Sequence, residues 1–105
     1  MSTFEDREKG FERKFANDQE LEFRAQTRGA KLLGEWAARK MGLEKVDDYA
    51  SAVVRSEINH GGADHLLHKV IQDLAASGVE ARESEIRAKL DEFLAVAREQ
   101  VKAGA

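Results

Sequence analysis

The chain has 105 residues, 42% of them hydrophobic, and a net charge of −3, which allows one small domain but no second core. It has no cysteine and no proline, so disulfides are excluded and the strongest helix breaker is missing. There is no apolar run of the ~18 residues that cross a membrane, and no positive excess typical of nucleic-acid-binding domains. We therefore expect an all-α cytoplasmic protein that neither inserts into the membrane nor binds nucleic acid.

The first seventeen residues differ from the rest and predict a flexible, potentially helical N-terminal arm (residues 1–17). Phe4, Phe11 and Phe15 are spaced by seven and four, so they would share one face of a helix. Gly10 weakens such a helix, and its i,i+4 charge pairs roughly cancel. The arm alone should be largely disordered. It could order by docking on its own bundle or on a partner, and the residues do not choose between these.

A first core helix is predicted over residues 18–41. Asn17, with Glu20 three residues later, resembles a capping box, and Gly42 is a good C-terminal stop. Four apolar positions fall on one face of this helix: Leu21, Ala25, Leu32 and Trp36. That face is rotated about 70° from the three phenylalanines. We therefore expect a break in the chain near Asn17.

The glycines inside this helix also carry a prediction. Gly29 and Gly34 each cost about 1 kcal/mol relative to alanine in a helix interior. Such a cost is reasonable if another helix crosses close to the backbone at these positions, so we expect two close helix crossings.

Three more helices are predicted over residues 47–58, 63–76 and 81–102, separated by turns rich in glycine. Their apolar positions follow helical spacing. These positions are Tyr49, Ala50, Val53, Val54 and Ile58; then Ala63, Leu66, Leu67, Val70, Ile71 and Leu74; and finally Ile86, Leu90, Phe93, Leu94, Ala97 and Val101. Four amphipathic segments with short connections predict a four-helix bundle over residues 18–103.

One flank of the first core helix is basic. Arg24, Arg28 and Lys31 would form a row, with Arg39 further along. Such a row can bind phosphates, although charged helix faces are often only solvated. Both interpretations stay open from the residues alone.

No pattern predicts catalysis or a metal. His60, Asp64, His65 and His68 are too loosely grouped for the three or four held ligands that zinc needs. The glycine pair 61–62 lacks the strand, lysine and helix of a phosphate-binding loop. No nucleophile lies beside a base, so we expect a protein that is not an enzyme and requires no cofactor.

Several segments together resemble one known family, the ζ subunit or ATPase inhibitor of α-proteobacterial F-type ATP synthases, once catalogued as a domain of unknown function. Their order and spacing cover essentially the whole chain. The segments are FEDREKGFERKFAND at residues 4–18, Phe23-Arg24, KLLGEWAA at residues 31–38, and Val53-Val54, Gly62, Asp64, Lys69 and Asp73-Leu74.

The resemblance implies a four-helix bundle and an inhibitory N-terminal region. In that family, this region enters the catalytic head of the synthase between catalytic subunits and the central shaft, and it blocks rotation in the hydrolysis direction. It also implies a location peripheral to the inner-membrane ATP synthase. By analogy, the inhibitory contacts would be made by Phe4, Arg7, Phe11, Arg13, Lys14 and Phe15.

The resemblance further implies that ADP or ATP binds the bundle as a regulatory ligand, with Arg24, Arg28 and Lys31 as its contacts. The chain departs from the family pattern at Gly29-Ala30, where an Arg-Asn pair is common, and at Glu35, where an apolar residue is common. A phosphate contact of the family would therefore be missing here. The alternative function is a stand-alone adenine-nucleotide-binding bundle without inhibitory activity.

Overall fold

The computed structural model describes the backbone of residues 3–60 and 62–104, and the side chains of residues 17–59 and 62–104. The chain forms four helices, α1 (Thr3–Met41), α2 (Val46–His60), α3 (Ala63–Ala76) and α4 (Glu83–Lys102). Within the described ranges there is no strand. The predicted all-α class with a helical bundle is therefore confirmed.

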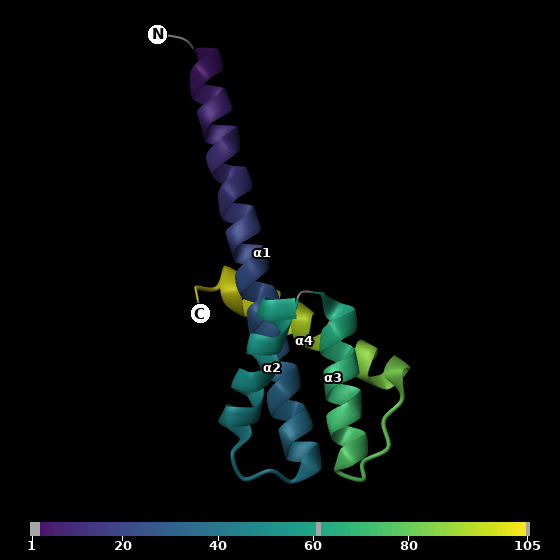
Figure 1. Cartoon of the computed structure of the whole chain (residues 1–105). Coiled ribbons are helices and arrows are strands. Elements are labelled where there is room, and N and C mark those ends of the chain that lie inside the picture. Colours follow the sequence, from purple (N-terminus) through teal and green to yellow (C-terminus); the bar gives the residue numbers. More distant parts are fainter. Residues whose placement is uncertain (1–2, 61, 105) are drawn as a thin grey trace.

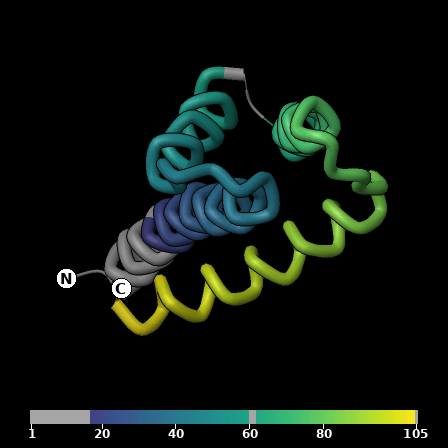
Figure 2. The backbone as a smooth tube through the Cα atoms, turned by 90° about the horizontal axis from the view of Figure 1, so that it is seen from below, coloured from purple at the N-terminus to yellow at the C-terminus, as the bar shows by residue number. Residues whose placement is uncertain are grey.

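Helix α1 is the central element of the bundle. It packs mainly along α2 and α4, while α3 contacts all three other helices. Figure 1 shows the N-terminal part of α1 extending well beyond the other helices, and the molecule measures 66 × 23 × 22 Å along its principal axes. Figure 2 shows α4 crossing the direction of α1 steeply. Among the described residues, α2 and α4 make no contact with each other, so one side of α1 lies open between them.

The core is built from aliphatic side chains of all four helices. The largest fully buried ones are Leu33, Val53, Leu67, Val70, Leu74 and Ile86. A smaller cluster, made by Ala25, Ala97 and Val101, lies where α1 meets the C-terminal part of α4. Each helix therefore buries one apolar stripe, as the sequence periodicity predicts.

The predicted close crossings at the two glycines of α1 are confirmed. A Cβ atom at Gly34 would lie 2.8 Å from the Cα of Ala50 on α2, and one at Gly29 would lie 2.7 Å from the Cδ2 of Leu94 on α4. Real Cβ atoms do not approach other atoms so closely. The two glycines therefore allow α2 and α4 to pack against the backbone of α1.

The predicted break near Asn17 is wrong, because α1 is one helix that continues through Asn17 from Thr3. The predicted buried face of the first core helix is right at Ala25 and wrong at Leu21 and Trp36. The buried stripe of α1 includes Ala30, Leu33 and Ala37, whereas Leu21 is 37% exposed and Trp36 only partly buried. How the phenylalanines are oriented relative to this stripe stays a prediction, because their side chains lie outside the described ones. A capping pattern is a local preference that a favourable continuing helix overrides.

Smaller differences concern the ends and faces of the other helices. Helix α2 is longer than the predicted 47–58 at both ends, and α4 begins at Glu83 rather than near residue 81. Ile58, expected to be available for burial, is 53% exposed, and Ala63 is also exposed. Both lie next to the α2–α3 connection, where the bundle ends and no helix covers them. The division into an arm (1–17) and a bundle (18–103) stays a prediction.

Candidate functional site

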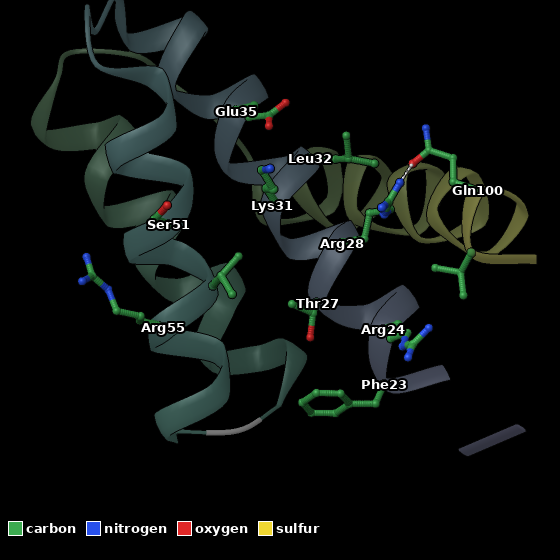
Figure 3. A pocket seen from close by; sticks show the side chains of 12 residues that line it. Phe23, Arg24, Thr27, Arg28, Lys31, Leu32, Glu35, Ser51, Arg55 and Gln100 are labelled. Atoms are coloured by element: carbon green, nitrogen blue, oxygen red, sulfur yellow. Dashed lines mark hydrogen bonds between the residues drawn. The ribbon is translucent and has the colours of Figure 1, made fainter. Parts of the chain in front are cut away.

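A groove of about 800 Å³ runs along the open side of α1, between α2 and α4. Its floor is formed by α1, from Phe23 to Glu35, and its walls are formed by one turn of α2 and the end of α4 (Figure 3). Its size is in the range of small-molecule sites in proteins. The groove therefore has the dimensions to hold a ligand as large as a nucleotide.

The three predicted cationic residues come together in this groove. Arg24, Arg28 and Lys31 all line it, over about 10 Å of helix length. Arg24 donates a hydrogen bond to Glu20 at 2.7 Å, and Arg28 donates one to the Gln100 side chain of α4 at 3.2 Å. Lys31 forms no ion pair with any residue whose side chain is described. Two of the three cations thus have described side-chain partners, and Lys31 has no described ion-pair partner.

A fourth cation, Arg55 of α2, also lines the groove and was missed by the sequence reasoning. Its side chain extends outward from α2 in Figure 3. Residue spacing on one helix cannot reveal a neighbour on another. Arg55 reaches the groove through the packing of α2 on α1, which includes the close approach of Ala50 to Gly34. Arg39, by contrast, does not line the groove; it lies 4.0 Å from the Glu35 carboxylate.

Apolar and neutral polar groups complete the groove. Phe23 is 59% exposed, and Leu32, Val54 and Val101 add aliphatic surface. The hydroxyl oxygen of Thr27 is buried and has no hydrogen-bond partner among the described residues. Because buried polar groups normally have a partner, this hydroxyl is a group that a ligand could satisfy. The groove thus combines cations with an exposed aromatic ring.

An ion pair links the α4 wall of the groove to α1. Arg98 donates two hydrogen bonds to the Glu22 carboxylate, at 3.2 and 2.9 Å. These bonds hold the pKa of Glu22 below its usual value. The pair lies where the C-terminal part of α4 packs on α1 through Ala25, Ala97 and Val101.

One groove residue opposes anion binding. Glu35 is the last residue of α1 that lines the groove, and its side chain is only 20% exposed. A carboxylate there repels a phosphate, since like charges disfavour each other most where water is partly excluded. Anion binding is therefore favoured toward Arg24 and Arg28, away from Glu35.

The predicted inhibitory contacts all belong to the N-terminal turns of α1. Their backbone is helical, but their side chains lie outside the described ones, so the choice between core and partner contacts stays open. These residues are Phe4, Arg7, Phe11, Arg13, Lys14 and Phe15.

Two of the three histidines, His65 and His68, have described side chains. His65 lies 3.1 Å from the Ser56 hydroxyl, and Asp64 pairs with Arg87 at 3.2 Å. Among the residues that the structure describes, no three His, Cys, Asp or Glu side chains are placed to hold a metal ion. No described helix is long and apolar enough to cross a membrane.

The fold and the groove thus define the chain as a small all-α helical bundle with a long protruding helix and a groove lined by cations. Comparison with family models then identifies the family: the model of ATPase inhibitor subunit zeta matches residues 1–100. The chain therefore belongs to this family, and the resemblance found in the sequence is confirmed. No curated protein matches the chain. Membership supports inhibition of ATP synthase as the role of the protein.

Proposed function

We propose that the protein inhibits ATP hydrolysis by F-type ATP synthase by inserting the N-terminal part of α1 into the catalytic head. The family match includes this part, since it begins at residue 1. Helix α1 starts at Thr3, and residues 17–20 are exposed, so the bundle does not cover the helix there. These observations support an element that reaches out to another protein while the bundle stays outside.

The length and composition of this element support a wedge. Residues 3–16 span about 20 Å as a helix, enough to reach from a surface into a subunit interface. Phe4, Phe11 and Phe15 are the aromatic anchors, and Arg7, Arg13 and Lys14 pair with carboxylates around them. A helix held between catalytic subunits and the central shaft obstructs rotation, which stops hydrolysis.

The test is ATP hydrolysis by the catalytic head of a matching synthase, measured with added chain. The full chain should inhibit. A chain lacking residues 1–16 should not, and Phe4, Phe11 and Phe15 changed together to alanine should weaken inhibition at least tenfold. Ile58→Ala, an exposed apolar change on the bundle, is the matched control and should inhibit fully. Absence of inhibition by the full chain rejects the function, and inhibition without residues 1–16 rejects the mechanism.

We further propose that ADP or ATP binds in the groove as a regulatory ligand. The convergence of Arg24, Arg28 and Lys31 on one groove supports this, because a row of cations matches a polyphosphate chain. The exposed ring of Phe23 offers a surface on which an adenine base can stack. The Thr27 hydroxyl, which has no hydrogen-bond partner among the described residues, supplies a hydrogen bond.

Calorimetric titration with ADP and ATP tests this second proposal. Arg28→Gln with Lys31→Gln should weaken binding at least tenfold, and Arg39→Gln, outside the groove, should leave it unchanged. Equal affinity in both variants would place the ligand elsewhere. The alternative of a stand-alone nucleotide-binding bundle requires this binding together with no effect on ATP hydrolysis, so the two assays separate the functions.

A further inference from the structure

The charges on the two sides of Asp18 mirror each other. Before it, the acidic residues Glu5, Glu8 and Glu12 are spaced by three and four. After it, the three basic groove residues are spaced by four and three. If the chain reversed at Asp18, one antiparallel register would bring all three opposite-charge pairs together. These pairs are Glu12 with Arg24, Glu8 with Arg28, and Glu5 with Lys31.

The same register matches apolar residues and brings no like charges opposite each other. It places Phe4 opposite Leu32 and Phe15 opposite Leu21. Leu21 is 37% exposed and Leu32 only partly buried, so both have surface to cover. At 100° per residue, the phenylalanines and glutamates fall within one arc of about 120° on their helix, and their opposite residues fall within an arc of similar width.

The reversal point is suited to a turn. Asn17 and Glu20 form the capping pattern that starts a helix, and two helices can be joined by as few as two to five residues. Residues 17–20 are exposed, so none of the other described helices covers α1 there.

We propose that residues 3–16 fold back at residues 17–19 and lie antiparallel on α1 in the groove, as a closed state of the protein. In this state, the three glutamates pair with Arg24, Arg28 and Lys31. The straight α1 is the open state, in which the arm is available to a partner. Because the arm uses the same cations that we propose for nucleotide phosphates, nucleotide and arm compete for the groove. This competition rests on the proposed nucleotide binding, whereas the fold-back does not.

Distances between two spin labels distinguish the two states. The chain has no cysteine, so Lys9→Cys with Arg39→Cys gives two unique labelling sites outside the proposed contact. The labelled positions are about 45 Å apart along a straight helix. They come to about 20 Å in the closed state, from helix rise and the spacing of packed helices. The ligand-free chain at low ionic strength should show the short distance.

Charge exchange tests the register. Reversing the three acidic charges of the arm (E5K, E8K and E12K) should remove the short distance between the labels. Reversing the three basic charges of the groove in the same chain (R24E, R28E and K31E) should restore it. Exchanging Asp6→Lys with Arg13→Glu, positions outside the contacting arc, should change nothing. A single long distance in the ligand-free chain overturns the fold-back. A short distance that survives the arm reversal, or is not restored by the double reversal, overturns it as well.

Adding ATP to the labelled chain tests the competition. Loss of the short distance supports it, and ATP that binds with the short distance intact overturns it. If ATP does not bind at all, the nucleotide proposal fails, while the charge-exchange result still decides the fold-back.

Discussion

The two halves of α1 are built from different residues. The half inside the bundle is made of small buried residues, such as Ala25, Ala30 and Ala37, with glycines where α2 and α4 cross. The half before Asn17 has three phenylalanines among many charges. Small residues let helices of the same chain approach, whereas aromatic and basic residues dominate the binding energy of interfaces. One helix thus serves as the centre of the core and, in the proposed function, as the binding element.

The largest loss of stability is expected from a substitution in the half of α1 that lies inside the bundle. Leu33→Ala removes a fully buried side chain and should lower the free energy of unfolding by about 2–5 kcal/mol. Phe11→Ala should lower it by less than about 1 kcal/mol, as expected where a side chain lies outside the core. Urea unfolding measures both. Similar losses for the two variants would show that the phenylalanine belongs to the core.

A smaller effect is expected at the glycine crossings. Gly34→Ala places a methyl group against the backbone of Ala50 and should cost about 1–3 kcal/mol. Gly29→Ala meets mainly the mobile end of Leu94, so its cost should be lower and partly offset by better helix propensity. Thermal unfolding of the two variants tests this order, and a more stable Gly34→Ala chain would contradict the close crossing.

A still smaller effect should come from a hydrogen bond within the bundle. Tyr49 donates to the Asp73 carboxylate at 2.8 Å, so Tyr49→Phe should cost about 0.5–1.5 kcal/mol at neutral pH. Burial and then Asp73 raise the pKa of Tyr49 above its usual value of 10. A raised pKa means that the tyrosine's contribution is complete below about pH 10 and is lost as pH rises further. The difference between wild type and variant, followed by urea unfolding, should therefore shrink above pH 10.

The smallest effect is expected at the α4 wall of the groove. Arg98 lowers the pKa of Glu22, so this pair stabilises the fold above the unfolded-state pKa of about 4.5 and loses its effect as pH falls through the folded-state value. Glu22→Gln should remove this acid dependence and cost less than Tyr49→Phe, because exposed pairs contribute little. If the Glu22→Gln chain loses stability at acid pH as steeply as the wild type, the ion pair is not the cause of this loss.

Much of the fold could be predicted because it follows from local signals. Glycine-rich turns and the helical spacing of apolar residues predicted four helices. Gly29 and Gly34 predicted the close crossings of α4 and α2 on α1. The start of α1 was mispredicted because Asn17 has only a local capping preference. Of the groove, the row on α1 could be predicted from spacing. Arg55 could not, because its position depends on how α2 packs against α1.

The central claim is that the N-terminal part of α1 is the inhibitory element and the bundle is its support. The most direct test compares ATP hydrolysis by the catalytic head with the full chain and with the chain lacking residues 1–16, after both are shown to be folded. We predict strong inhibition by the first and none by the second. Equal inhibition by the two chains would contradict the account.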